Sequence, residues 1–480
     1  MQIRNSLSFL LAVFISISVY GFSGDPGYNI RVDVKNFDKD TLLLGYYLGD
    51  KQYLRDTTTV DKKGRFLFTS ENALEPGLYM IVFPPENNFF ELIINETEQD
   101  IVVDVDFLDL KNSIKVKGSK DHLLFESYKD FLSDKRVIAQ SLRDSIGKFS
   151  RDDPNYISIN LELDNLDLLV KEYQDNLINN NPGTVTRNIV RASQQINIPE
   201  FEGDEETVRN LQFQYYRKHY WDAVDLGDPL LLRTPLLFGK VDNFITRLTP
   251  QIPDSINSAL SIVLDKMYPA KETFMFYLVY YLNHYAKSQY VGMDGVYVHL
   301  VNTYYKTEKA DWVDSTQLAS IIENADKLEP LLIGKTAPDI RVYKQDGEPI
   351  SLHEVQAEYT LLLFWAQDCG HCKKSFPGII DFYKNYKSKG IEIFAVCSKL
   401  MDEELGCWEY LKDKEGADWI NTSDKYMRSG FKVKYNIIST PQLYLLDKDK
   451  KIVTKKVPAE KLPEILDIIL EQDAQSTESK

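Results

Sequence analysis

Two cysteines separated by two residues are the side chains in this sequence best suited to chemistry. The motif Cys369-Gly370-His371-Cys372 follows the apolar run 360–366, which has the length and composition of a buried strand. A helix that begins at the first cysteine would direct unpaired N–H groups and the positive end of its dipole at the sulfur. Such groups stabilise a thiolate, the nucleophile of disulfide exchange. The spacing predicts that Cys369 attacks a disulfide and that Cys372 resolves the mixed disulfide.

Two neighbours of Cys369 are expected to influence its ionisation in opposite directions. His371 lies between the two cysteines, where it can donate a hydrogen bond or place positive charge near Cys369. Asp368 directly precedes Cys369, and a charged carboxylate there raises the pKa of the thiol because it disfavours a second negative charge.

Zinc binding is the alternative use of a Cys-x-x-Cys pair. A closed zinc site needs about two further Cys or His ligands at suitable spacing. The other cysteines are Cys397 and Cys407, and Cys397 ends an apolar strand-like segment, which points to core packing. Four further histidines are scattered without ligand spacing: His122, His219, His284 and His299. We therefore expect no metal and no cofactor other than a redox-active Cys369–Cys372 disulfide.

The second pair of cysteines has two open interpretations. Cys397 lies in a predicted strand, and Cys407 lies in a predicted helix beside Trp408. A disulfide between a strand and a helix requires Cα atoms within about 7 Å of each other. We expect two free buried thiols, with a second disulfide as the alternative.

Three regions of different pattern divide the chain. Residues 22–118 contain short alternating segments separated by turns, such as Asp61-Lys62-Lys63-Gly64, and predict an antiparallel β sandwich-like domain. Residues 119–330 show apolar positions three and four apart, and predict an all-α domain with a buried helix at 274–282. Residues 331–471 alternate strand and helix signals, as an α/β domain does. The polar tail 472–480 is expected to be disordered.

The N-terminus and the charge indicate where the protein works. Residues 1–21 combine Arg4, an apolar run at 9–19 and a small-residue site, which predicts a cleaved signal peptide rather than a membrane anchor. The formal net charge of -16 disfavours nucleic-acid binding, because such a surface repels phosphates. We expect a protein exported to the periplasm or cell envelope.

The C-terminal region resembles thioredoxin-like proteins of the TlpA/ResA type. The resemblance rests on Trp365-Ala366-x-x-Cys369-x-x-Cys372-Lys373, on Pro377 in the following helix and on Ile438-Ser439-Thr440-Pro441. It implies a thioredoxin fold with an extra helix and strand around 403–419. It also implies a cis proline at Pro441 that brings the Thr440 backbone beside Cys369, and a shielding or core role for Trp365.

Two departures from that family concern proton transfer. Thioredoxins carry a buried acid two residues before the tryptophan, where this chain has Leu363, and many ResA-like relatives carry a glutamate at the position of Ser375. Both acids assist proton transfer to the resolving thiol. The base is therefore not identified by sequence, and the Gly-His spacer resembles that of disulfide isomerases.

The upstream regions resemble domains of unknown function that precede thioredoxin modules in Gram-negative envelope proteins. Asp56-Thr57 with Val60-Asp61-x-x-Gly64-x-Phe66 carries the first resemblance, and 217–222 (RKHYWD) carries the second. Neither supplies a catalytic role, and a binding or assembly role is the natural expectation.

Taken together, these features predict an exported thiol–disulfide oxidoreductase, with the reductase direction favoured by family resemblance. Its partners would be protein disulfides or dithiols and a membrane or periplasmic electron-exchange protein. Two alternatives stay open. One is an envelope scaffolding protein in which the redox domain is secondary. The other is a peroxidase of the AhpC/TSA type, although the Pro/Thr-rich peroxidatic loop of that class is not found.

Overall fold

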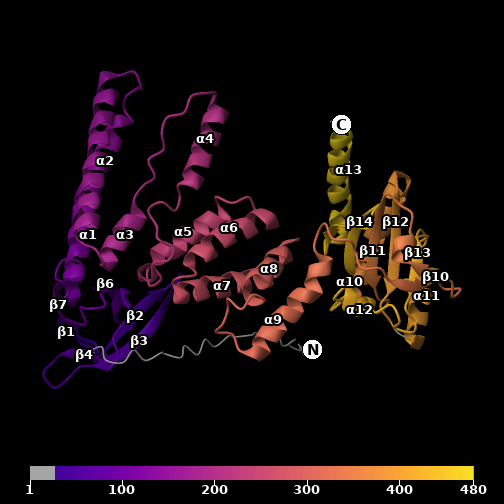
Figure 1. Cartoon of the computed structure of the whole chain (residues 1–480), viewed down its shortest axis with the longest axis horizontal. Coiled ribbons are helices and arrows are strands. Elements are labelled where there is room, and N and C mark those ends of the chain that lie inside the picture. Colours follow the sequence, from indigo (N-terminus) through magenta and orange to yellow (C-terminus); the bar gives the residue numbers. More distant parts are fainter. Residues whose placement is uncertain (1–26, 400, 479–480) are drawn as a thin grey trace. The chain divides into compact units, whose positions relative to one another are not determined.

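The computed structural model describes residues 27–399 and 401–478 (Figure 1). The chain forms two compact units that divide after Asp242, within helix α5 (Pro235–Thr246). The signal peptide predicted for residues 1–21 lies outside the described residues. In the described part of the chain, no helix combines the length and apolar character needed to cross a bilayer.

The first unit begins with two four-stranded sheets that enclose a shared core. One sheet has the order β4-β1-β7-β8 and the other β3-β2-β5-β6. Buried residues from both sheets, such as Ile30 and Leu42, belong to one hydrophobic cluster, which makes this a sandwich. The strands are β1 (Asn29–Lys35), β2 (Thr41–Leu48), β3 (Lys51–Thr59), β4 (Phe66–Thr69), β5 (Gly77–Phe83), β6 (Asn88–Ile94), β7 (Asp100–Asp106) and β8 (Lys115–Lys117).

Two details of the sandwich differ from the sequence expectation. The sheets are not wholly antiparallel, because β1 pairs with β7 in parallel along its full length. The turn at Asp61 does form, closed by a bond from the Asp61 N–H to the Arg65 carbonyl and with Gly64 at φ 76°. It does not join a hairpin within one sheet, because β3 pairs with β2 and β4 pairs with β1.

The helices of the first unit are tied to the sandwich by a buried carboxylate. Asp121, in the first turn of α1, accepts bonds from the N–H groups of Val185 (2.7 Å) and Thr186 (3.0 Å) at the start of α3. It also accepts one from the Asn95 amide, next to β6, at 2.8 Å. These helices are α1 (Lys120–Ile146), α2 (Pro154–Asn180), α3 (Val185–Ser193) and α4 (Glu205–Lys218).

The second unit opens with helices that bury aromatic side chains. The predicted buried helix is confirmed: α7 (Lys271–Ala286) buries Phe274, Tyr277 and Tyr281 on one face. Its neighbours are α6 (Pro253–Met267), α8 (Asp294–Leu300), a π-helical turn (Val301–Tyr305) and α9 (Ser315–Leu328). The aromatic stripe is therefore core.

A seven-stranded mixed sheet forms the α/β domain of the second unit, in the order β10-β9-β13-β12-β11-β14-β15. Its strands are β9 (Arg341–Tyr343), β10 (Pro349–Ser351), β11 (Tyr359–Trp365), β12 (Ile391–Cys397), β13 (Ile420–Ser423), β14 (Gln442–Asp447) and β15 (Ile452–Lys455). Its helices are α10 (Gly370–Tyr386), α11 (Leu405–Lys412), α12 (Phe431–Lys434) and α13 (Leu462–Glu478). The extra helix and strand expected after residue 403 are α11 and β13.

The central strand β11 is buried along its whole length and contributes side chains to two hydrophobic clusters, one on each face of the sheet. Leu363 and Trp365 pack into a cluster with α10 residues such as Phe376, whereas Leu362 and Phe364 pack into the opposite cluster. This alternation follows from the two-residue period of a strand. Burial on both faces explains why the sequence reads as an unbroken apolar run.

Helix α13 corrects the expectation for the tail. The helix continues to Glu478, through most of the segment 472–480 that was expected to be disordered. The sequence there contains Gln, Ala and Glu, which are good helix formers and allow the turns begun at Leu462 to propagate.

Candidate active site

Cys369 occupies the N-cap position of α10, three residues after the last buried residue of the strand-to-helix turn, Ala366. Its Sγ accepts a hydrogen bond from the Cys372 N–H at 3.2 Å. An N-cap side chain normally satisfies an orphan N–H in this way, and here the capping atom is the sulfur that the sequence predicts to be the nucleophile. The helix start therefore stabilises negative charge on Cys369.

The loop before β14 completes the surroundings of Cys369. The Thr440–Pro441 peptide bond is cis, and the Cys369 thiol donates to the Thr440 carbonyl oxygen at 3.1 Å. The structure thus places Thr440 and Pro441 beside the Cys-x-x-Cys motif although about seventy residues separate them. The Thr440 backbone lies outside the strands of the sheet, and a backbone segment at such a place can pair with an extended peptide.

The two cysteines differ strongly in ionisation. Burial would raise the pKa of Cys369, but hydrogen bonds with the side chains of Cys372 and Thr440 and from the N–H groups of Cys372 and His371 outweigh it and hold that pKa below its usual range. Burial, followed by the hydrogen bond with Cys369, raises the pKa of Cys372 to about 12. Both cysteines are free thiols. Of the two, the part-exposed Cys369 thiol is therefore the more readily ionised, and the buried Cys372 thiol holds its proton more tightly.

The other predicted site residues lie where their sequence positions suggest. Trp365 is 1% exposed and packs edge-on against Phe376, with ring centroids 4.8 Å apart, so it is a core residue beneath the motif. The side chain of His371 is exposed in the first turn of α10. Leu363 is fully buried in the cluster that contains Cys372, where thioredoxins place their acid.

Lys399 is a site residue that sequence reasoning missed. Its Nζ lies 2.6 Å from the carboxylate of Asp368, and the pair is part-exposed. The hydrogen bond with Lys399 lowers the pKa of Asp368 and raises that of Lys399. Lys399 therefore partly offsets the charge that was expected to disfavour the Cys369 thiolate. The signal was available, because Lys399 follows a strand parallel to β11, and neighbouring parallel strands end at the same edge of a sheet.

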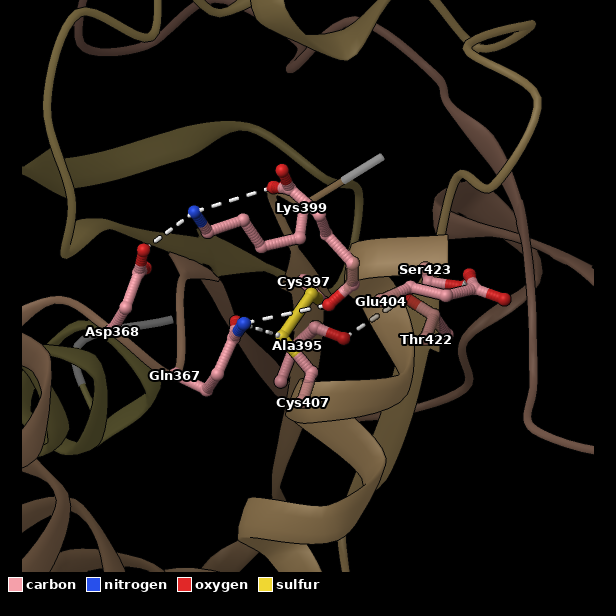
Figure 2. Close-up of a disulfide and its surroundings, with 10 residues drawn as sticks. Gln367, Asp368, Ala395, Cys397, Lys399, Glu404, Cys407, Thr422 and Ser423 are labelled. Carbon is pink, nitrogen blue, oxygen red and sulfur yellow. Dashed lines mark hydrogen bonds and ion pairs between the residues drawn. A yellow bond between two sulfur atoms is a disulfide. The ribbon is translucent and has the colours of Figure 1, made fainter. Parts of the chain in front are cut away.

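Cys397 and Cys407 correct a second expectation, because they form a disulfide and are not free thiols (Figure 2). Helix α11 packs on the end of β12 closely enough to bring the two Cα atoms to 6.4 Å, within the range that a disulfide spans. Both residues are 1% exposed. In this state neither sulfur offers a thiolate for a second pair of zinc ligands.

A cleft of about 340 Å³ opens beside Cys369. Its walls come from the motif, from the segment after β12, from α12 and from the loop before β14, and include Lys399, Lys432, Ile437, Ile438 and Thr440. Ile438 is 87% exposed at its rim. A cleft of this composition can receive a peptide with an apolar side chain next to its reacting sulfur. Across the described residues, no group of three or more His, Cys, Asp or Glu side chains is arranged to hold a metal ion.

The ionisation of the two cysteines predicts their relative alkylation. With the Cys369–Cys372 pair reduced, iodoacetamide is expected to modify Cys369 roughly 10³-fold faster than Cys372 near pH 7, since only the thiolate reacts. The rate at Cys369 should rise with pH and level off below the usual thiol pKa, whereas Cys372 should stay protected up to strongly alkaline pH. Mass-spectrometric quantification of each site checks this. Equal rates at the two sulfurs would contradict the assignment.

Comparison with known families agrees with the three-part organisation. The Redoxin family model matches residues 332–469. Two families described as domains of unknown function match the upstream parts, DUF5106 at residues 171–328 and DUF4369 at residues 28–125. The upstream resemblances seen in the sequence are therefore confirmed, and neither description assigns a function.

Solved structures with similar folds include a domain of a possible thiol-disulfide isomerase from Cytophaga hutchinsonii. It is 36% identical and covers 32% of this chain and 99% of its own, with a TM-score of 0.28. A thioredoxin-like protein from Bacteroides caccae is 18% identical and covers 57% of this chain and 99% of its own, with a TM-score of 0.43.

Curated relatives are named as thiol-disulfide oxidoreductases. The thiol-disulfide oxidoreductase ResA of Bacillus cereus is 32% identical over 133 residues, which cover 27% of this chain and 72% of the relative. The ResA of Bacillus anthracis is 33% identical over 131 residues, which cover 27% of this chain and 71% of the relative. With a Redoxin match over its C-terminal domain and this likeness over most of each relative, the chain belongs to the ResA family of thiol-disulfide oxidoreductases.

Proposed function

We propose that this protein is exported and exchanges disulfides with envelope proteins through Cys369 and Cys372, acting as a reductase. The observation that carries the proposal is the position of the Cys369 sulfur. It lies 3.2 Å from the N–H of Cys372 at the helix start and 3.1 Å from the Thr440 carbonyl, at the edge of an open cleft. A stabilised thiolate, a peptide-pairing carbonyl and a resolving thiol are the parts that the reaction needs.

The exchange proceeds in two substitutions at sulfur. The Cys369 thiolate attacks one sulfur of the partner disulfide, forms a mixed disulfide and expels the other partner sulfur as a thiolate. Cys372 then loses its proton and attacks the Cys369 sulfur, which releases the partner's second thiolate. Two electrons have passed to the partner, and the protein holds a Cys369–Cys372 disulfide. Because burial holds the Cys372 proton tightly, we infer that the second step is the slower one near neutral pH.

Continued turnover requires an electron donor. The oxidised pair must receive two electrons from another dithiol, and in an exported protein this donor is a membrane or periplasmic protein, because the oxidising compartment supplies no reducing buffer. Substrates are expected to be proteins with accessible disulfides and an apolar residue near the reacting sulfur, which suits Ile437 and Ile438 in the cleft.

The reduction potential of the Cys369–Cys372 couple tests the direction. Equilibration with glutathione buffers is expected to give a value near that of thioredoxin, about −270 mV, as a reductase needs. A value of about −120 to −180 mV would instead make the protein an oxidase or isomerase. A couple that does not form its disulfide reversibly would remove the redox mechanism.

Export and the redox role are tested separately in cells. Mass spectrometry of protein from the periplasmic fraction should show a mature N-terminus directly after residue 21, whereas an intact N-terminus in the cytosolic fraction would contradict export. A C369S/C372S variant should fail to complement a deletion strain. Full complementation would favour the scaffolding role for the two upstream domains.

A further inference from the structure

The Cys397–Cys407 disulfide closes a short segment that lies against residues 366–369, the turn between β11 and α10 (Figure 2). We call this turn the reactive turn. We call this segment, residues 398–399 and 401–406, the staple segment. The disulfide joins the two residues that flank it, and Glu404 within it is 6% exposed and accepts a hydrogen bond from Ser423 on β13. Neither anchor takes part in the Cys369–Cys372 reaction, so the fold keeps a buried disulfide here for another reason.

The staple segment holds the two residues that directly precede Cys369. The Lys399 ammonium bonds the Asp368 carboxylate at 2.6 Å and also lies 3.5 Å from Glu403. The Gln367 amide donates to the Glu403 carbonyl at 3.4 Å. The ion pair between Lys399 and Asp368 is drawn in Figure 2, where Gln367 and Asp368 both point toward the staple segment.

The disulfide itself touches the reactive turn. The Cys407 Sγ lies 3.1 Å from the Gln367 side-chain oxygen. Gly406 leaves room for this contact, because a Cβ on it would lie 2.8 Å from the Gln367 side-chain nitrogen. Breaking the disulfide would therefore free the segment at the point where it packs against Gln367, and with it the placement of Lys399.

We propose that the Cys397–Cys407 disulfide positions the reactive turn, and that its reduction releases Lys399 from Asp368 and makes Cys369 a weaker nucleophile at neutral pH. The inference rests on the proposed role of Cys369. Reduction takes two electrons and two protons from an external dithiol, which becomes a disulfide, and leaves two thiols at Cys397 and Cys407. The protein then has one cysteine pair that exchanges disulfides and a second pair whose redox state changes the nucleophilicity of Cys369.

Charge gives the direction of the effect. The groups around Cys369 are Asp368 and Lys399 with Glu403, His371 and Lys373 on α10, and Lys432 in the cleft wall. Of these, the Asp368–Lys399 pair depends directly on the staple segment. An unpaired Asp368 in the same cleft as the sulfur raises the thiol pKa by about half a unit and lowers the thiolate fraction near pH 7 by up to about threefold.

The test measures alkylation of Cys369 against pH in the full-length protein, with iodoacetamide and quantification by mass spectrometry. One sample has only the Cys369–Cys372 pair reduced, by brief dithiothreitol treatment, and its Cys397–Cys407 bond is verified by intact mass. A second sample has both pairs reduced by prolonged phosphine treatment. The second should show an apparent pKa of Cys369 about half a unit higher. Identical pH profiles would overturn the proposal.

Variants test the same step without reductant. C397A/C407A and K399M should each reproduce the shift, and adding D368N to either should remove it. K387M is the matched control, since Lys387 pairs with Asp418 at 3.0 Å outside the staple segment; it should keep the wild-type profile. If the pKa of Cys369 still shifts when D368N is present, the Asp368 charge does not cause the shift and the proposal is overturned. A wild-type protein whose Cys369 shows no enhanced reactivity near pH 7 would instead contradict the proposed function.

Discussion

A Cys372→Ser variant is expected to stop turnover and to accumulate as a mixed disulfide between Cys369 and its partner. The backbone N–H that bonds the Cys369 sulfur at 3.2 Å remains when residue 372 is serine, and the hydroxyl is still a donor, so the attack step survives. A hydroxyl cannot displace the partner from sulfur. Turnover should fall on the order of 10³-fold or more, as when a residue essential to a covalent intermediate is removed.

Non-reducing electrophoresis and intact mass of the trapped adduct measure this result. Cys369→Ser is the matched control, because it should lose turnover to the same extent and yet trap nothing, since Cys372 is 1% exposed and its pKa is raised to about 12. Release of partner by Cys372→Ser at the wild-type rate would show that another thiol resolves the intermediate. Trapping by Cys369→Ser would exchange the roles of the two cysteines.

An Asp294→Ala variant is expected to destabilise the second unit by about 3 kcal/mol, because it leaves a buried cation without its counter-ion. The Lys455 ammonium, at the end of β15, is 3% exposed and donates to the Asp294 carboxylate and to the Leu331 carbonyl. Burial lowers the pKa of Lys455, and the charge of Asp294 opposes that shift. Without Asp294, one carbonyl alone would face the cation.

Urea unfolding followed by far-UV circular dichroism gives the change in free energy. Glu464→Ala removes an ion pair with Lys461 whose side chains are 62% and 61% exposed, and it should leave the unfolding curve close to that of the wild type. D294L/K455M should recover most of the loss, because a well-packed apolar pair can replace a buried ion pair. If Asp294→Ala has no larger effect than Glu464→Ala, the buried pair does not stabilise this unit.

The sequence predicts best what depends on local pattern. The run 360–366 became β11 (Tyr359–Trp365), and the cysteines that follow it became the N-terminus of α10, because burial on both faces of a strand and capping of a helix are both visible in neighbouring residues. The change of pattern near residue 118 likewise falls between β8 and α1.

Features that depend on packing between distant elements were missed. The Cys397–Cys407 bond requires α11 to lie on the end of β12, and ten residues of separation do not specify that distance. The ion pair between Asp368 and Lys399 joins two strand ends, and it could have been predicted once the parallel pairing of β11 and β12 was assumed. Alternation in β1 reveals its buried face and says nothing about its neighbours.

The parallel pairing of β1 with β7 has a consequence for synthesis. As the chain emerges N-terminus first, β1 gains its antiparallel neighbour when Phe66–Thr69 appears and its parallel neighbour only when Asp100–Asp106 appears. Until then one edge of β1 offers unpaired backbone groups to other chains. Its core residues Ile30 and Val32 also lack the β7 side chains that pack in the same hydrophobic cluster. The sandwich therefore closes late and slowly, as sheets built from non-local pairs do. We expect that a nascent chain needs to be held apart from its neighbours during that interval.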